Sequence, residues 1–109
     1  MANVLKVLGQ LKPGAASLGD LYTVPALTAT VGSTITICNQ SATADSYRVA
    51  VRVAGAAINV IQYLFFDAPI AGNQTQTWTL GLALATTDVV SVRSTNGTTS
   101  FNLFGQENS

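Results

Sequence analysis

The residue types that carry most enzyme chemistry are scarce in this chain. It has no histidine and a single cysteine, Cys38. Without histidine, neither a Ser-His-Asp nor a Cys-His nucleophile can be assembled, and no histidine-containing metal site can form. The carboxylates stand singly, and the aspartates among them lie at predicted strand ends, where aspartate is an ordinary turn residue; they are Asp20, Asp45, Asp67, Asp88 and Glu107. We therefore expect a protein that is not an enzyme and that holds no metal and no cofactor.

Two patterns would suit binding rather than catalysis. Tyr22, Tyr63 and Trp78 could stack on sugars, although burial in a core is the commoner fate of such residues. Threonine recurs in T-x-T triplets that resemble the ladders of ice-binding β-proteins, at residues 28–30, 34–36 and 75–77. The triplets are irregularly spaced and threonine is a good strand former in general, so ordinary strand residues are the favoured interpretation.

Charge is sparse and balanced. Charged residues make up 9% of the chain, and the formal net charge is zero; an average soluble protein has about 25% charged residues. The basic residues form no run, so nucleic acid is not an expected partner; they are Lys6, Lys12, Arg48, Arg52 and Arg93. Because net charge keeps a free monomer soluble, a chain this neutral and apolar is predicted to hide part of its surface in an assembly.

The sequence has no recognisable targeting or membrane segment. A signal peptide would need a basic stretch, an apolar stretch and a small-residue cleavage site, and none is present. No apolar run reaches the roughly 18 residues of a membrane helix, so we expect no membrane partner and synthesis in a cytoplasm. Cys38 closes the apolar run 35–38 and is predicted to be an inert packing residue.

The elements that position these residues are predicted to be strands. Glycine, proline and Asn/Asp clusters interrupt the chain roughly every ten residues. The predicted strands cover 3–10, 21–24, 28–39, 46–54, 59–66, 74–80, 88–94 and 98–104. This pattern is typical of an all-β protein, an antiparallel β-sandwich of about seven or eight strands, jelly-roll or immunoglobulin-like. One domain, 1–109, is expected, with an N-terminal strand or arm at 1–12 and a polar, mobile tail at 105–109.

Several local signals refine these strands. Residues 46–54 alternate, so Tyr47 and Val49 should face the core and Arg48 the opposite side. Trp78 and Leu80 are predicted to face inward. The segment 32–33 (GS) suggests a bulge, 81–87 a crossover, and 96–97 (NG) a hairpin turn. The first segment could also form one helical face, but Gly9 within it and 12–14 (KPG) after it favour a strand.

Three predicted strands are apolar on both faces. In 62–69 (QYLFFDAP), Tyr63 and Phe65 should face one way, and Leu64 and Phe66 the other. Segments 4–8 and 101–104 behave alike. Strands buried on both faces, without covering helices, require another chain. The candidate interface residues are Val4, Leu5, Val7, Leu8, Tyr63, Phe65, Phe101, Leu103 and Phe104.

Within 62–69, the hydroxyl of Tyr63 suits an interface rim better than a dry core. We therefore expect Phe65, on the same face, at the contact and Phe66 in the core.

Several segments, in this order, resemble small virion-associated structural proteins of tailed bacteriophages. They are 6–10 (KVLGQ), 21–25 (LYTVP), 47–51 (YRVAV), 79–84 (TLGLAL), 88–90 (DVV) and 100–105 (SFNLFG). The likeness spans nearly the whole chain. It implies a β-rich particle component, either a capsid decoration (cement) protein or a tail or fibre accessory, and it carries over no catalytic or ligand-binding residues.

Composition and resemblance together lead to one functional hypothesis. The chain is predicted to be a virion protein that decorates and stabilises a capsid. Its expected partners are copies of itself, as a homo-oligomer and specifically a trimer, and the major capsid protein or other virion proteins. The alternatives are a tail, neck or fibre component and, from another class, a carbohydrate-binding receptor module.

Overall fold

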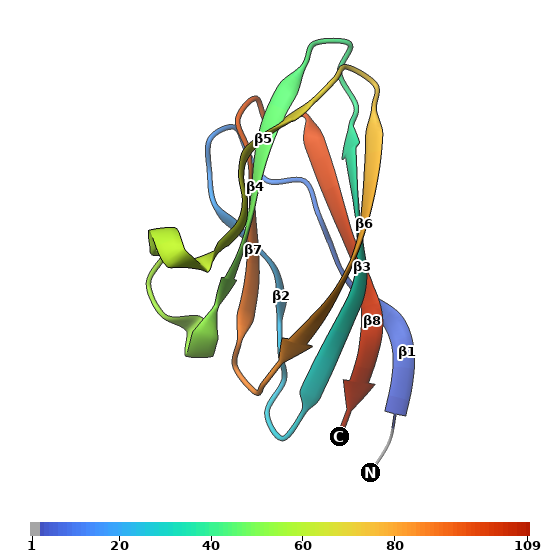
Figure 1. The fold of residues 1–109 in the computed structure, drawn as a ribbon, viewed down its shortest axis with the longest axis vertical. Helices are drawn as coiled ribbons and strands as arrows, with labels where there is room; N and C mark the ends of the chain where they lie inside the picture. Colours follow the sequence, from blue (N-terminus) through green and yellow to red (C-terminus); the bar gives the residue numbers. More distant parts are fainter. Residues whose placement is uncertain (1–2) are drawn as a thin grey trace.

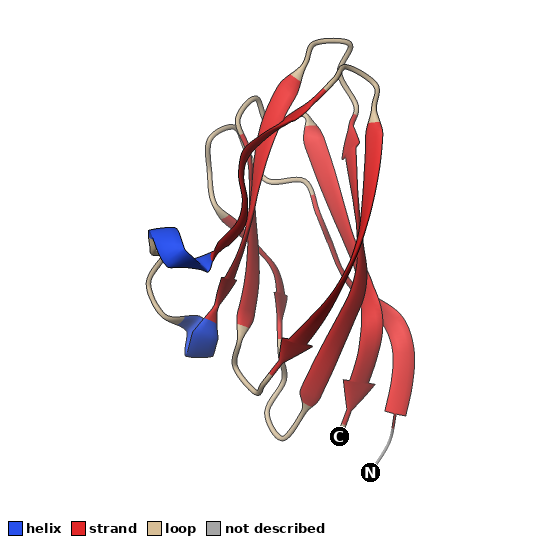
Figure 2. Cartoon of the chain, in the orientation of Figure 1, coloured by secondary structure: helices blue, strands red, loops and turns tan. Residues whose placement is uncertain are grey.

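Two four-stranded antiparallel sheets pack face to face in the computed structural model, which describes residues 3–109 (Figures 1 and 2). Sheet A has the order β1-β8-β3-β6, and sheet B has the order β2-β7-β4-β5. The strands are β1 (Asn3–Leu11), β2 (Gly19–Thr23), β3 (Ala29–Asn39), β4 (Asp45–Arg52), β5 (Tyr63–Ile70), β6 (Thr75–Leu84), β7 (Val89–Ser94) and β8 (Thr99–Asn108). The predicted antiparallel β-sandwich is confirmed.

The order of the strands identifies the sandwich as a jelly roll. The chain passes from one sheet to the other at almost every connection, and only β4 and β5 are consecutive in one sheet. Eight strands wound in this way form the double-sheet jelly roll rather than the seven-stranded constant-type immunoglobulin arrangement. Between β4 and β5 the chain makes two 3-10 turns, η1 (Val53–Gly55) and η2 (Val60–Gln62), that project from sheet B (Figure 2).

The core lies between the sheets and is built by alternating residues. On β4, Tyr47 and Val49 are fully buried, as the alternation predicts, while Arg48 points to the outer side. On β8, Phe101 and Leu103 are 0% and 1% exposed. They face sheet B from a strand that has neighbours on both edges, so no other chain can reach them.

Asn3–Leu11 form a strand, as predicted for the N-terminal segment, and this strand carries one irregularity; residues 1–2 of that segment lie outside the described residues. The pairing of β1 with β8 shifts register between Val7 and Gly9. Leu8 lies at this bulge and joins the core at 9% exposure. The expected bulge at residues 32–33 is also confirmed, because β3 shifts register between Gly32 and Thr34 against both of its neighbours.

Three predicted boundaries are wrong. Residues 59–62 do not extend β5, because the side chain of Asn59 accepts from the N–H of Ile61 and caps η2. Residues 81–84 are not a crossover but the end of β6, and Leu84 of this segment is buried. Residues 96–97 do not form a hairpin, since they connect β7 of sheet B to β8 of sheet A.

The C-terminal residues are part of the sandwich, against the prediction of a mobile tail. Gly105–Asn108 continue β8 and pair with β1 on one side and with β3 on the other. Glu107 accepts hydrogen bonds from the hydroxyl of Tyr22 and from Lys6 Nζ. Because Tyr22 belongs to sheet B, the end of the chain also joins the two sheets.

Candidate functional site

The buried carboxylate of Asp88 accepts hydrogen bonds that hold the backbone of neighbouring loops. Asp88 is buried and accepts from the N–H groups of Ala54 and Ala85. Among residues 3–109, no group of three or more His, Cys, Asp or Glu side chains is placed to hold a metal ion. In the same part of the chain, no helix is long and apolar enough to cross a membrane.

The predicted interface residues separate into buried and exposed sets. Leu8, Phe101 and Leu103 are core residues, so the prediction that they contact another subunit is wrong. The reason is the pleat: each faces sheet B, and its outward neighbours carry the exposed surface. The exposed set lies on β1 and β8, with fractional exposures of 47% for Val4, 80% for Leu5, 46% for Val7 and 36% for Phe104.

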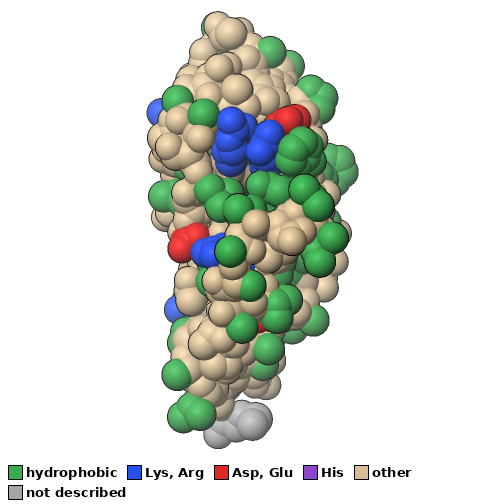
Figure 3. Space-filling view, turned by 90° about the vertical axis from the view of Figure 1, so that its left-hand side faces the viewer, with side chains coloured by type: hydrophobic (Ala, Val, Ile, Leu, Met, Phe, Trp, Pro, Cys, Tyr) green, Lys and Arg blue, Asp and Glu red, His purple; other side chains and the backbone are tan. Residues whose placement is uncertain are grey.

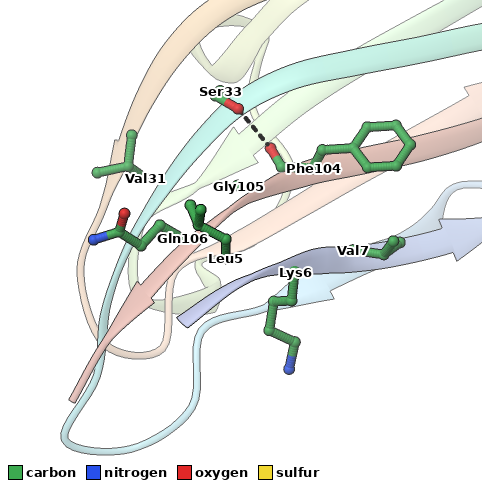
Figure 4. Close-up of a pocket in the computed structure, with 8 residues that line it drawn as sticks. All are labelled: Leu5, Lys6, Val7, Val31, Ser33, Phe104, Gly105 and Gln106. Atoms are coloured by element: carbon green, nitrogen blue, oxygen red, sulfur yellow. Dashed lines mark hydrogen bonds between the residues drawn. The ribbon is translucent and has the colours of Figure 1, made fainter. Parts of the chain in front are cut away.

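Leu5, Val7 and Phe104 of this set border a shallow hollow on the outer face of sheet A, and Val4 is not among its lining residues (Figure 4). Its apolar walls are Leu5, Val7, Val31 and Phe104, and its volume is about 550 Å³. We call this site the apolar hollow. Antiparallel pairing creates it, since Val7 is opposite Phe104 in the register of β1 and β8. Val31, 43% exposed, comes from β3 and was not predicted.

Polar groups at the hollow are already engaged or uncharged. Ser33 donates its hydroxyl to the carbonyl of Phe104 at 3.2 Å. Lys6 borders the hollow, but its side chain points away from Leu5 (Figure 4) and its ammonium lies 3.4 Å from a carboxylate oxygen of Glu107. The hydrogen bonds from Tyr22 and Lys6 keep the pKa of Glu107 below its ordinary value, against the opposing effect of burial. The hollow therefore presents an apolar surface to solvent.

A second surface lies on the outer face of sheet B and contains aromatic rings and arginine. Tyr63 and Phe66 meet edge to face at 5.0 Å between ring centroids. The guanidinium carbon of Arg48 lies 4.0 Å from the centroid of Phe66. With Ile58 and Val60, these residues line a depression of about 500 Å³. Figure 3 shows hydrophobic side chains gathered around the arginine and acidic side chains of this face.

The two phenylalanines of this segment have the reverse of their predicted roles. Phe65 packs against the core, with Tyr47 at 5.8 Å and Trp78 at 5.4 Å between centroids, whereas Phe66 is 56% exposed. β5 departs from simple alternation because its pairing with β4 shifts register twice, and Asp67 has a φ of 50°. As a result Tyr63 and Phe66, three residues apart, share one side.

Charge on this face is organised around Asp67. Arg48 donates to both carboxylate oxygens of Asp67, at 2.7 and 3.1 Å, and Arg93 lies 3.9 Å away. Hydrogen bonding from Arg48 holds the pKa of Asp67 below its ordinary value. Two cations thus share one carboxylate, which leaves a small positive excess beside the aromatic rings.

The segment 53–62 stands out from sheet B and carries its apolar side chains into solvent; we call it the protruding loop. Ile61 is 87% exposed, Val60 79% and Val53 67%. The backbone of the loop is nevertheless held, because Arg52 donates to the carbonyls of Gly55 and Ala56. The sequence pattern predicted strands over 53–54 and 59–62 and left only 55–58 between them, so it missed this exposed loop.

The remaining candidate residues lie elsewhere. Thr34 pairs with Thr79 and Thr36 with Thr77, so parts of two threonine triplets are side by side on sheet A. Tyr22 is buried and cannot stack on a sugar, and Trp78 faces inward at the sandwich edge while remaining 40% exposed. Cys38 is half-buried on the outer face of sheet A, and not in the apolar core, because it alternates with the buried Ile37 and Asn39.

Comparisons of the chain with family models, with curated proteins and with solved structures find no match. The apolar hollow, the aromatic depression and the protruding loop are therefore the features from which a function can be proposed. All three are surfaces that water covers in the isolated chain, and two of them are walled mainly by hydrophobic side chains.

Proposed function

We propose that this protein is a structural subunit of a bacteriophage particle, a capsid decoration (cement) protein that contacts copies of itself and the major capsid protein. The observation that carries the proposal is the apolar hollow on the β1–β8 face. Exposed apolar patches rimmed by polar residues mark protein–protein contacts. The likeness of the sequence to small virion proteins points the same way, and the jelly roll is found in viral capsid and lectin domains, which is an analogy of fold.

The mechanism of such a protein is clamping. Each contact that buries Leu5, Val7 and Phe104 removes apolar surface from water, at about 25 cal/mol per Å² before the costs of association. Contacts that bridge neighbouring capsid subunits resist the outward pressure of packaged DNA. We propose a homo-oligomer, a trimer, as the decorating unit, located on the virion. The low charge of the chain fits a surface that is covered in the assembled state.

The number of copies per particle tests this role. Quantitative mass spectrometry of purified particles that contain the chain should find hundreds of copies, as repeated capsid contacts require. A count of a few to tens would overturn the capsid role and favour a tail, neck or fibre component. Loss of the chain from these particles on washing would remove the particle role altogether.

A second candidate function, a carbohydrate-binding receptor module, is favoured by the aromatic depression. Aromatic faces with a few polar groups are the usual lining of small-ligand sites, and Tyr63, Phe66 and Arg48 supply both. However, Arg48 already covers one face of the Phe66 ring. A glycan array decides the matter: glycan binding that Phe66→Ala abolishes would support the receptor module, and no binding by the intact protein would exclude the sugars tested.

A further inference from the structure

The protruding loop is an apolar projection with a held shape. Val60 and Ile61 at its tip are mostly exposed, yet the loop is capped reciprocally by Asn59 and Gln62. Gln62 accepts from the N–H of Asn59 at 2.7 Å and donates to the carbonyl of Ala57 at 3.1 Å. A projection whose backbone is fixed loses little conformational entropy when it docks, so its apolar tip is suited to insertion.

The apolar hollow has space for an apolar group and shares the apolar character of such a tip. A cavity of about 150 Å³ is enough for benzene, and the hollow has about 550 Å³. Its apolar walls are aliphatic except for Phe104, and its polar lining residues are Lys6, Ser33 and Gln106. The segment 53–62 contains no charged residue, and the charge of Lys6 at the rim of the hollow is directed to Glu107. Neither surface therefore brings an unpaired charge into a contact with the other.

The two surfaces lie on opposite sides of the sandwich. The loop projects from the outer face of sheet B (Figure 1), and the residues that line the hollow lie on β1, β3 and β8 of sheet A (Figure 4). A chain cannot place its own loop in its own hollow, because both sheets stand between them. One copy can, however, offer its loop to a second copy and its hollow to a third at the same time.

We infer that the protruding loop of one copy inserts Val60 and Ile61 into the apolar hollow of a neighbouring copy. The inference rests on the proposed role as an assembly subunit and specifies the contact between subunits. The contact is heterologous, meaning that the two sides are different surfaces, so it closes into a ring or continues as an open stack. It differs from a two-fold contact in which hollow meets hollow.

Mixed single-cysteine variants test this pairing on the purified protein. In a Cys38→Ser background, Ile61→Cys and Leu5→Cys each place one thiol, on the loop or in the hollow; Ser fits position 38 because the side chain is small and half-buried. Disulfides form only where Cα atoms come within about 7 Å. Under mild oxidation, the mixture should give covalent dimers containing one copy of each variant, at least about tenfold above either variant alone.

The control is Leu27→Cys, which puts a thiol on a residue that is 92% exposed and outside both surfaces. Mixed with either variant, it should give only the background yield. Dimers of Leu5→Cys alone at the yield of the mixture would overturn the inference and favour hollow against hollow. Background yield in every mixture would also overturn it.

Charged substitutions supply an independent measurement. Ile61→Asp and Leu5→Asp should each weaken self-association by about 10- to 1,000-fold, because each buries an unpaired carboxylate in the contact. Leu27→Asp should leave it unchanged. All three residues are at least 80% exposed, so the subunit fold is retained. Since no particle is present, failure here would sink this contact while the count of copies per particle still decides the proposed function.

Discussion

At the scale of single residues, Asp45 shows how a carboxylate works as a joint without a cation. It is 6% exposed and accepts from the hydroxyls of Ser94 and Thr99 and from the N–H groups of Ser46 and Asn96. Burial alone raises the pKa of Asp45, but these hydrogen bonds outweigh burial and the pKa lies below its ordinary value. The carboxylate thereby ties β4 and the end of β7 to the start of β8 across the sandwich.

Asp45→Asn should lower the free energy of unfolding by about 1–3 kcal/mol at neutral pH, because a buried charge-assisted cluster loses acceptors. The folded pKa of Asp45 is depressed, so its contribution is present above the unfolded pKa of about 3.9 and is lost as pH falls through the folded value. Urea unfolding of the wild type and of Asp45→Asn, at pH values from neutral down to below the folded pKa of Asp45, measures this loss of stability. The control Asp20→Asn, at a surface ion pair, should cost less than about 1 kcal/mol. Equal costs for the two substitutions would contradict the role of Asp45.

Tyr22 makes the corresponding joint at the other end of the sandwich, with Thr30 and Glu107. Burial first, and then its hydrogen bond to Glu107, raise the pKa of Tyr22 to about 12. A raised folded pKa means that this stabilisation is complete below the unfolded value of about 10 and is lost as pH rises through about 12. Wild type should therefore lose stability over that interval, while Tyr22→Phe, less stable by about 1 kcal/mol at neutral pH, should lose less. Tyrosinate absorbance follows the titration of Tyr22. If Tyr22→Phe loses as much stability as wild type at alkaline pH, the assignment of that loss to Tyr22 is wrong.

At the scale of elements, alternation of apolar and polar residues correctly predicts which side chains are buried in strands that have no bulge. In β4, Tyr47 and Val49 are inward and Arg48 outward, as the pattern requires. In β5, Phe65 and Phe66 still face opposite ways, but the register shift between Phe65 and Tyr63 places Tyr63 on the side of Phe66, and no feature of QYLFFDAP reveals where a bulge will fall. A bulge depends on the partner strand, so it is a property of the pair rather than of the segment.

The prediction of a mobile tail at the end of the chain was wrong for a related reason. Residues 105–109 are polar, and polar termini without partners are usually mobile. Here the backbone of Gly105–Asn108 is paired on both sides, and the polar side chain of Glu107 has its own donors. The turn at 96–97 joins two sheets because its neighbours β7 and β8 pair with distant strands. The structures of 105–108 and of the turn at 96–97 both depend on pairing with strands far away in the sequence, which the local sequence does not encode.

Truncation of the two phenylalanines in β5 measures the reversal directly. Phe65→Ala should lower the free energy of unfolding by about 2–4 kcal/mol, because it removes a ring packed between Tyr47 and Trp78. Phe66→Ala should cost about 1 kcal/mol or less, since its ring lies on the surface under Arg48. Chemical denaturation of the purified variants gives both values. A larger loss for Phe66→Ala would restore the original assignment of the two rings.

At the scale of the whole molecule, only some of the residues predicted to form an assembly surface are exposed. Val4, Leu5 and Val7 are exposed, as a strand apolar on both faces implies, and Phe104 joins them across β8. Val31 could not be found from the sequence, because it reaches the hollow only through the register of β3 with β8. The protruding loop was missed because apolar residues within 53–54 and 59–62 fit the pattern of a strand.

The low charge of both surfaces leads to a prediction about salt. We expect the purified protein to form a homo-oligomer whose mass, measured by light scattering, stays above the 11.3 kDa of one chain. Added sodium chloride shortens the range of charge–charge interactions to about 3 Å at 1 M, so an interface held by Leu5, Val7 and Phe104 should not dissociate. Sulfate, which strengthens apolar burial, should tighten the interface.

The control Arg48→Gln removes the cation stacked on Phe66 and should leave the mass of the oligomer unchanged. Dissociation in sodium chloride to a single chain would instead assign the contact to the arginines and Asp67 on sheet B, and a single chain under every condition would remove the apolar hollow as a contact between copies.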